Sequence, residues 1–334
     1  MPTPCRGTVE WAAASLALAR KEPDQPMMHH VLFLSCLAMA QNSLPPGDHT
    51  RSLEVGQRTR SYLVHIPKSY DGTKPVPVLL AFHGGGTHAQ AMVEFSGLNE
   101  KAEQEGFVVV YPNGTGRLER ILTFNAGNCC GYALQQKVDD VAFTRALLDD
   151  LARVVNVDAA RIYATGMSNG AMICYLLASE LSDRIAAIAP VGAPMGTETC
   201  HPQRPVPVMH FHGTDDQYAP FQGGKGKGLS GTDFYSVEHT ILAWVKANGC
   251  QQQPTVVKLP TRVEDGTTIE VQTYGGGKQG SEVVLVVIHG GGHTWPGREP
   301  RARFLGKSTQ NVSANDLMWE FFQKHALREP ARSR

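Results

Sequence analysis

A serine flanked by glycines lies where a strand-like segment meets a helix-like one. Residues 166–170 (GMSNG) have the spacing G-x-S-x-G, after the apolar run at 161–165 and at the start of the helical pattern at 168–181. So tight a turn needs neighbours almost free of side chains, and it exposes the Ser168 hydroxyl beside the N-terminal N–H groups of the helix. Such a hydroxyl could attack a carbonyl carbon. The alternative is a structural turn whose serine only caps the helix.

A second glycine cluster follows another strand-like run. Residues 76–82 are continuously apolar, and a histidine with three glycines (HGGG, 83–86) comes next. In such a loop one backbone N–H can stabilise a developing oxyanion, with a second N–H from the residue after the serine. The pattern nominates Gly85, or its neighbour Gly86, together with Asn169, and the histidine is expected to brace the loop. A phosphate-binding loop is the competing interpretation, but its glycine-lysine spacing is missing.

A histidine that could act as a general base follows the apolar run at 282–288. His289 continues this run and would point into the layers of a sheet, whereas His293 lies on the glycine-rich loop beyond it. A base for Ser168 must reach the hydroxyl and must be neutral at the working pH. We therefore expect His293 to be the base.

Two adjacent carboxylates stand where an acid that orients this base would belong. Asp215 and Asp216 follow the strand-like run at 206–212. Their spacing leaves both open, with a preference for Asp216. The chain order Ser168, Asp216, His293 is the order found where the nucleophile sits on a strand-to-helix elbow. These three residues together would perform acyl transfer.

Strand-like and helix-like segments alternate from residue 58, which predicts an α/β fold with a mostly parallel, twisted sheet and helices on both faces. The expected strands are 58–67, 76–83, 107–112, 161–165, 185–191, 206–212, 255–259, 268–274 and 282–288, with the last closing the sheet. The expected helices are 89–105, 138–154, 168–181, 236–248 and 317–325, the last capped by Ser313 or Asn315, and 113–136 is expected to be a polar loop. Because only residues 192–205 separate two central strands, we expect no large lid.

The composition predicts one large globular domain. The 334 residues are 42% hydrophobic and 19% charged, with a formal net charge of zero and a pI of about 7.2. We expect a single catalytic domain over residues 50–328 and a frayed tail at 329–334. The balanced charge gives no reason to expect nucleic acid or an anionic membrane as a partner. No run approaches the roughly 20 apolar residues of a membrane span.

The N-terminal region differs from the rest of the chain. Residues 31–40 (VLFLSCLAMA) form a short apolar run that ends in Ala-Met-Ala. This pattern is typical of the apolar core and cleavage site of a secretory signal peptide. The sequence therefore predicts a leader over residues 1–40 and a secreted protein, extracellular or periplasmic. A disordered extension is the alternative.

Seven cysteines occur, of which five follow the predicted leader. Cys174 lies in an apolar helical stretch and is expected to be a buried free thiol. Cys129, Cys130, Cys200 and Cys250 lie in loop-like sequence and allow three pairings. We expect the adjacent Cys129 and Cys130 each to reach a distant loop rather than to bond each other. No C-x-x-C or H-x-x-x-H spacing supports a metal site, and no metal or organic cofactor is predicted.

Seven segments between residues 52 and 325 stand out together. They are GTGRLERILTFNAGNCCG, KVDDVAFTRALLDDL, RIYATGMSNGAM, IAAIAPVGAPM, HFHGTDDQYAPFQGG, GGGHTWPG and SANDLMWEFF. In this order they resemble the poly(3-hydroxybutyrate) depolymerase-like esterases, a family that also holds feruloyl and acetyl-xylan esterases. The resemblance implies an α/β-hydrolase fold, export, and ester hydrolysis without a metal or organic cofactor. It places the family's nucleophile, histidine and acid motifs on Ser168, His293 and Asp216, and its vicinal cysteines on Cys129 and Cys130.

Three aromatic residues are candidates for contact with a substrate. Trp295 follows the expected base by two residues, and Tyr218 lies on the loop after the acid. Each could stack on an aromatic acyl group or a sugar ring, or could pack beneath a loop. Phe124 stands near a position where many members of the family have tryptophan, which predicts a different substrate-facing wall.

The resemblance implies an ester as the substrate, either small or polymeric. Feruloyl or related aryl esters of plant polysaccharide are the first expectation, because extracellular polyester depolymerases commonly add a linker and a polymer-binding domain that this sequence lacks. Hydrolysis of poly(3-hydroxybutyrate) or another short polyester is the second. A non-catalytic binding protein on the same fold is an alternative of a different class, although no member of the triad is missing.

Overall fold

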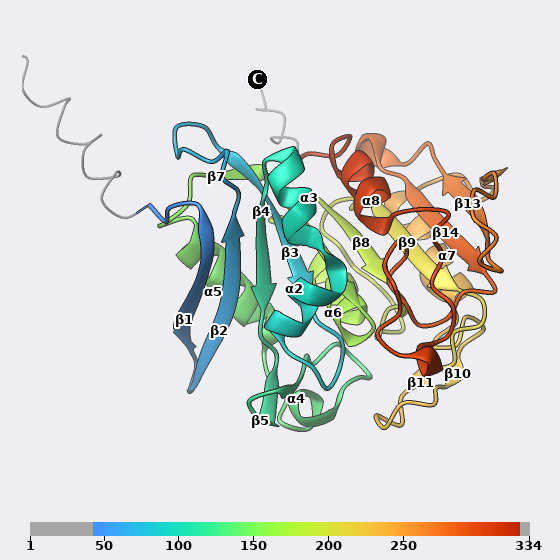
Figure 1. The fold of residues 1–334 in the computed structure, drawn as a ribbon, viewed down its shortest axis with the longest axis horizontal. Coiled ribbons are helices and arrows are strands. Elements are labelled where there is room, and N and C mark those ends of the chain that lie inside the picture. The colour runs from blue at the N-terminus through green and yellow to red at the C-terminus, as the bar shows by residue number, and fades with distance from the viewer. Residues whose placement is uncertain (1–42, 328–334) are drawn as a thin grey trace, which may run out of the picture. The chain divides into compact units, whose positions relative to one another are not determined.

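Residues 43–327, which the computed structural model describes, form one large sheet between two layers of helices (Figure 1). The leader predicted over residues 1–40 and the tail at 329–334 lie outside the described residues. The strands are β1 (Gly47–Val55), β2 (Arg58–Ile66), β3 (Val76–Phe82), β4 (Val108–Pro112), β5 (Thr115–Leu118), β6 (Ile121–Thr123), β7 (Val157–Met167), β8 (Ala187–Val191), β9 (Val208–Gly213), β10 (Gly224–Lys225), β11 (Asp233–Phe234), β12 (Thr255–Lys258), β13 (Thr268–Tyr274) and β14 (Val283–His289). The helices are α2 (Ala89–Ser96), α3 (Leu98–Glu105), α4 (Gly131–Gln135), α5 (Asp140–Leu151), α6 (Asn169–Glu180), α7 (Val237–Asn248) and α8 (Ala314–Phe322), with short 3-10 turns η1 (Lys278–Gly280) and η2 (Arg303–Leu305).

The central part of the sheet is parallel, as the alternating pattern predicts. The strand order is β1-β2-β4-β3-β7-β8-β9-β14-β13-β12. The strands from β4 to β14 in this order run parallel, whereas β1 and β2 at one edge and β13 and β12 at the other pair antiparallel. The expectation that the run at 282–288 closes the sheet is wrong, because the antiparallel β13 and β12 add to β14 and make it an interior strand.

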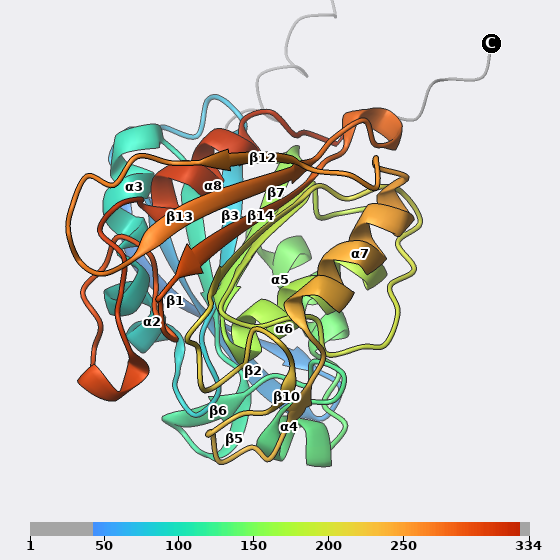
Figure 2. The same cartoon turned by 90° about the vertical axis from the view of Figure 1, so that its right-hand side faces the viewer.

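Two hydrophobic cores fill the two faces of the sheet. In β3, Val78, Leu80 and Phe82 belong to the core beneath α5, α6 and α7, whereas Leu79 and Ala81 belong to the core beneath α2, α3 and α8. Both faces are therefore apolar, which explains why the central strands read as continuous apolar runs. Figure 2 shows the sheet between these two helical layers.

Several boundaries differ from the predicted ones because single residues or local pairing interrupt the pattern. The helix expected over 89–105 is two helices, since Gly97 has φ 63° and ends α2. The polar loop expected over 113–136 contains the β5–β6 hairpin and α4. Ser313, one of the two expected caps, caps α8 by accepting from the N–H of Asp316. The sheet also begins at Gly47, before the expected domain boundary at residue 50.

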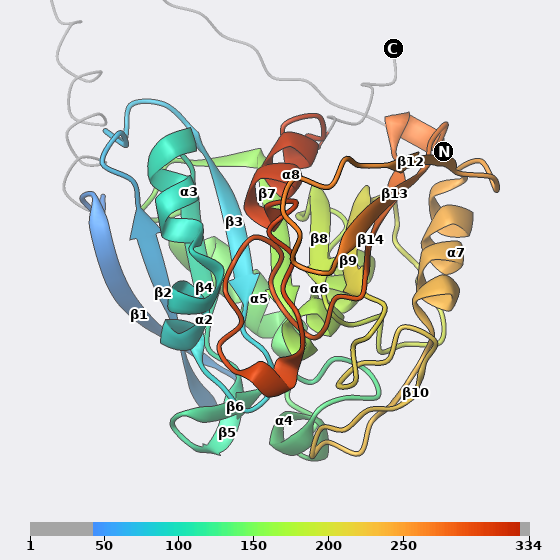
Figure 3. The ribbon, with the colours of Figure 1, turned by 45° about the vertical axis from the view of Figure 1, so that its right-hand side comes forward.

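The loops at one end of the sheet build the region described next. Figure 3 shows the β5–β6 hairpin, α4, β10 and the loop before α8 gathered at this end. The connection from β8 to β9, residues 192–207, contains no helix or strand, in agreement with the absence of a large lid there. None of the helices within residues 43–327 is long and apolar enough to cross a membrane.

Candidate active site

Ser168 lies on a sharp turn between β7 and α6. Its backbone has φ 59° and ψ −121°, a conformation that non-glycine residues rarely adopt. The Ser168 side chain makes no capping hydrogen bond to α6, whereas Ser236 and Ser313 cap α7 and α8 in the usual way. The hydroxyl is therefore not used as an N-cap, and the turn has the form of a nucleophile elbow.

The glycines of the motif lie against backbone atoms. A Cβ added to Gly170 would collide with the carbonyl of Phe82, and one added to Gly166 would collide with the carbonyl of Gly170. The start of α6 thus approaches β3 more closely than any side chain allows. The same approach brings Ser168 beside the loop after β3, where a Cβ on Gly84 would lie 3.7 Å from the Ser168 Cβ.

The imidazole of His293 contacts a buried carboxylate. Its Nδ1 lies 2.6 Å from Oδ2 of Asp216, a residue that is 4% exposed. Asp215 is exposed and accepts a hydrogen bond from the hydroxyl of Thr214. The structure therefore brings Asp216, and not Asp215, to the histidine. Because a carboxylate only accepts, the Nδ1 of a neutral His293 carries the proton, which leaves its Nε2 as the basic nitrogen.

The environment of Asp216 favours the ionised carboxyl. Burial raises the pKa of Asp216, but the adjacent His293, His212 and the N–H of Ala219 lower it, and the net pKa is below the ordinary value. Oδ1 accepts from the N–H groups of Tyr218 (2.8 Å) and Ala219 (2.9 Å). Two backbone N–H groups thus hold Oδ1 in place, and Oδ2 remains to orient His293.

Ser168 and His293 line the same cavity. The N–H of Ser168 donates to the carbonyl of Val191 at 2.9 Å, and a Cβ on the next residue, Gly192, would lie 3.6 Å from Nδ1 of His293. Both residues therefore meet at the carboxyl end of β8. His289 does not line this cavity: its side chain is 48% exposed and lies 3.9 Å from Glu270, on the neighbouring strand.

The two nominated backbone donors lie next to each other in the cavity wall. A Cβ on Gly85 would lie 3.5 Å from the Cβ of Asn169. The N–H of Gly86 donates to the carbonyl of Leu122 at 2.8 Å, so Gly86 is already engaged. Within residues 43–327 the N–H groups of Gly85 and Asn169 have no acceptor. Of the alternatives left open by the sequence, Gly85 is the one with a free donor.

His83 braces the loop that carries Gly85. Its Nε2 accepts from the N–H of Gly114 at 3.0 Å, so its Nδ1 carries the proton and donates to the carbonyl of Gly84 at 2.7 Å. Burial lowers the pKa of His83 to about 4, which keeps the ring neutral. In the trans peptide that follows, the N–H of Gly85 points away from the carbonyl of Gly84. The bond from His83 therefore also sets the direction of the Gly85 donor.

Sequence comparison identifies relatives of this chain. No family model matches it. "Putative esterase NocK" from Nocardia uniformis subsp. tsuyamanensis is 30% identical over 286 residues, which cover 81% of this chain and 81% of that protein. Feruloyl esterase B of Piromyces equi is 31% identical over 242 residues, which cover 70% of this chain and 42% of that protein. The chain belongs to the feruloyl esterase-like family. It is a serine carboxylesterase, and it hydrolyses carboxylic esters.

The esterase has the α/β-hydrolase fold that the resemblance implied. Its structure is similar to that of the acetyl xylan esterase from Aspergillus awamori, with a TM-score of 0.53 and 13% sequence identity. The match covers 82% of this chain and 99% of that protein. The predicted fold class is confirmed.

The cavity of the esterase has a volume of about 670 Å³ and a largely apolar lining. Several of its apolar residues were not nominated from the sequence, among them Met92, Phe95, Ile121, Leu229 and Phe304. They come from separate loops and helices, so no local spacing links them. One signal was present: Leu229 is the lone apolar side chain in the segment GGKGKGLSG (223–231), and it is fully exposed at the cavity.

Of the three candidate aromatic residues, Tyr218 alone lines the cavity. Its ring centroid lies 5.4 Å from that of His293. Trp295 is 1% exposed, its indole N–H donates to Asn315 at 2.9 Å, and its ring packs on Phe95. Trp295 therefore packs beneath the loop and cannot stack on a substrate, because the core between α2 and α8 surrounds it.

Phe124 does not form a substrate-facing wall. Its ring is fully buried, with its centroid 5.3 Å from that of Phe82 and 4.6 Å from that of His83. The expectation from the sequence is wrong for this side chain, because the backbone turn at 124–130 directs it into the core rather than into the cavity. The residues of this turn that line the cavity are Cys129 and Cys130.

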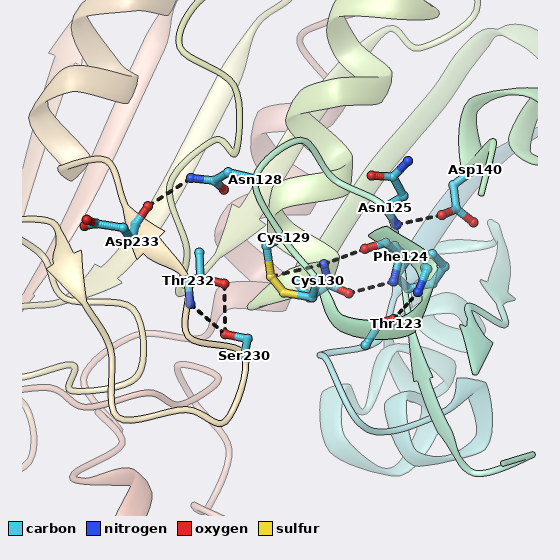
Figure 4. Close-up of a disulfide and its surroundings, with 12 residues drawn as sticks. Thr123, Phe124, Asn125, Asn128, Cys129, Cys130, Asp140, Ser230, Thr232 and Asp233 are labelled. Carbon is cyan, nitrogen blue, oxygen red and sulfur yellow. Dashed lines mark hydrogen bonds between the residues drawn. A yellow bond between two sulfur atoms is a disulfide. The ribbon is translucent and has the colours of Figure 1, made fainter. Parts of the chain in front are cut away.

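Cys129 and Cys130 form a vicinal disulfide, shown in Figure 4. The expectation that each reaches a distant loop is wrong, because the two cysteines bond each other within one loop, where their Cα atoms are 3.1 Å apart. Among the described residues Cys174, Cys200 and Cys250 are free, and Cys174 is buried as expected. No group of three His, Cys, Asp or Glu side chains in residues 43–327 is arranged to hold a metal ion.

Proposed function

We propose that Ser168, His293 and Asp216 form the catalytic triad of this ester hydrolase, with Gly85 and Asn169 as the oxyanion hole. The observation that carries the proposal is the 2.6 Å contact between His293 and the buried Asp216, at a cavity that Ser168 also lines. The free N–H groups of Gly85 and Asn169 in the wall of the same cavity support it.

The chemistry is a two-step acyl transfer. His293 Nε2 removes the hydroxyl proton as Ser168 Oγ bonds to the ester carbonyl carbon, and the displaced electron pair forms an oxyanion. The N–H groups of Gly85 and Asn169 donate to this oxyanion. When the ester C–O bond breaks, His293 gives its proton to the departing alcohol and an acyl-serine remains. Water then loses a proton to His293, attacks the acyl carbon and releases the acid, and Ser168 regains its proton.

The preferred substrates are feruloyl or related aryl esters of plant polysaccharide. Two features support this choice: the apolar lining of the cavity, where an aryl acyl group can be buried beside Tyr218, and the similarity to feruloyl esterase B. The second candidate is poly(3-hydroxybutyrate) or another short polyester. The exposed apolar side chains of Ile121, Leu229 and Phe304 at the cavity favour it, because they could contact a hydrophobic polymer.

The triad is tested with Ser168→Ala and the matched variant Ser230→Ala, since Ser230 also lines the cavity. Ser168→Ala should lower the hydrolysis of 4-nitrophenyl acetate by about 10⁴-fold, and Ser230→Ala should leave it within about threefold of wild type. Activity of Ser168→Ala equal to that of Ser230→Ala would reject the triad. The wild-type rates on methyl ferulate and on amorphous polyhydroxybutyrate then decide between the two substrate classes.

The esterase is also proposed to act outside the cytoplasm, extracellularly or in the periplasm. This proposal rests on the apolar run at 31–40, which lies outside the described residues. Sequencing the N-terminus of the mature protein from culture medium or periplasm tests it, and a start within residues 1–30 would contradict it.

A further inference from the structure

Two buried histidines on β9 take no part in the proposed triad. His210 and His212 are 0% and 1% exposed, and Nε2 of His210 lies 3.0 Å from Nδ1 of His212. The hydroxyl of Tyr175, on α6, lies 2.8 Å from Nδ1 of His210. At the other end, Nε2 of His212 lies 2.7 Å from the carbonyl oxygen of Ala219. These contacts form a continuous hydrogen-bond chain from α6 to the loop after β9.

The partners at the ends set the direction of every bond in this chain. A carbonyl oxygen only accepts, so Nε2 of His212 carries a proton and donates to Ala219. Nδ1 of a neutral His212 must then accept from Nε2 of His210, and Nδ1 of His210 must accept from the hydroxyl of Tyr175. Burial lowers the pKa of both histidines, which is consistent with two neutral rings.

The chain ends on the segment that carries the proposed acid. Nε2 of His212 lies 3.5 Å from Oδ2 of Asp216, the oxygen that contacts His293. Ala219, whose carbonyl accepts from His212, donates its own N–H to Oδ1 of Asp216. His212 therefore acts on the carboxylate twice, through the position of Ala219 and through an N–H dipole next to Oδ2. The ring of His212 also packs at right angles on that of Phe221, which offers no polar group.

We propose that His212, oriented by His210 and Tyr175, is a positioning residue that holds Asp216 in the geometry needed to orient His293. The proposal rests on the triad proposed above. If the loop that carries Ala219 lost its bond to His212, the carboxylate of Asp216 could move relative to the imidazole of His293. Displacements of this kind reduce turnover without weakening substrate binding. The neutral state of His212 matters, because its Nδ1 must accept while its Nε2 donates.

Two substitutions of His212 separate positioning from simple filling of space. His212→Leu removes the donor, whereas His212→Gln keeps an amide N–H that can reach the carbonyl of Ala219. We expect His212→Leu to lower kcat for 4-nitrophenyl acetate by about 10- to 100-fold with KM unchanged, and His212→Gln to restore kcat to within about fivefold of wild type. Equal kcat for His212→Leu and wild type would overturn the proposal, as would equal losses in the two variants.

Tyr175→Phe tests the far end of the chain and remains informative if His212→Leu does not fold. Without the hydroxyl, Nδ1 of the buried His210 loses its donor, so the ring of His210 is held less firmly against His212. We expect kcat to fall about threefold with KM unchanged. Tyr111→Phe is the matched control, since Tyr111 is also buried and its hydroxyl donates to Asn99 on the opposite face of the sheet.

The control variant should lose similar stability and keep the wild-type kcat. Equal kcat for Tyr175→Phe and Tyr111→Phe would overturn the role of Tyr175. The two proposals fail in different ways. If the proposed triad is wrong, Ser168→Ala keeps its activity. If the triad is right and the positioning role is wrong, Ser168→Ala is inactive while His212→Leu and Tyr175→Phe keep the wild-type kcat.

Discussion

The side-chain amide of Asn169 pairs with both backbone groups of Phe124. Oδ1 accepts from the N–H of Phe124 at 2.7 Å, and Nδ2 donates to its carbonyl at 3.0 Å. The residue after Ser168 is thereby tied to the turn that contains the vicinal disulfide, and Nδ2 also lies 3.8 Å from Sγ of Cys129. Because the amide satisfies a donor and an acceptor at once, no other side chain of this size fits the same pair.

The first prediction concerns the replacement of this amide by a carboxylate. Asn169→Asp keeps the shape of the side chain but places a negative oxygen against the carbonyl of Phe124. The charge would be buried, since Asn169 is 2% exposed. We expect a loss of about 3 kcal/mol in the free energy of unfolding, measured with urea. Asn128→Asp is the control, because that exposed amide makes one bond to the carbonyl of Asp233. Equal losses in the two variants would contradict the prediction.

The second prediction concerns the glycine after Asn169 on the elbow. Gly170→Ala should prevent folding or cost at least about 3 kcal/mol, because the new methyl group would collide with the carbonyl of Phe82. Gly275→Ala is the control: its Cβ would meet no atom within 4 Å, and its φ is not positive. Thermal unfolding of the two variants measures the difference. A stable Gly170→Ala protein would show that α6 can move away from β3.

The third prediction tests whether the exposed side chain at the cavity contacts the acyl group. Leu229→Ser should raise KM for methyl ferulate by about tenfold, because a long aryl acyl group loses apolar contact there. KM for 4-nitrophenyl acetate should stay the same, since an acetyl group is too short to gain this contact. Leu242→Ser, at an exposed position on α7, is the control and should change neither value. An unchanged KM for methyl ferulate would exclude Leu229 from the acyl site.

The fourth prediction is a pH dependence of stability. Burial lowers the pKa of His83 to about 4 and lowers the pKa of His210 and His212, whereas an unfolded imidazole titrates near about 6.5. Below pH 6.5 the unfolded chain therefore binds protons that the folded chain excludes, so stability is full above this pH and falls as the pH decreases. Each histidine contributes up to about 1.4 kcal/mol per pH unit in this range.

Urea unfolding at pH 7.5 and at pH 5.5 measures this fourth effect. Carboxylates change little between these values, so the buried histidines should dominate the difference. His201→Gln, at an exposed position, should keep the full difference, whereas His83→Gln should reduce it. The same free energy of unfolding for the wild type at both pH values would contradict the prediction.

The order of the site residues along the chain could be predicted because it depends on local sequence. A G-x-S-x-G segment between a strand and a helix specifies its own turn, and the strand ends before Asp216 and His293 place these residues at one end of a parallel sheet. The apolar runs predicted most of the strands for the same reason, since a strand buried on both faces has no polar positions. Regular helices and central strands are dictated by neighbours in sequence, and so is the elbow.

The direction in which individual side chains point was decided by the tertiary structure. Asp216 and Asp215 are adjacent and chemically identical, and burial against His293 distinguishes them. The N–H of Gly86 is not free to bind a substrate oxygen, because it donates to the carbonyl of Leu122 in a hairpin that no local pattern predicts. Trp295 is enclosed by a helix that follows it in sequence. Each of these outcomes depends on contacts between segments far apart in the chain. The sequence by itself determined which groups could react and at which end of the sheet they gather, whereas packing between distant loops decided which of them face the cavity.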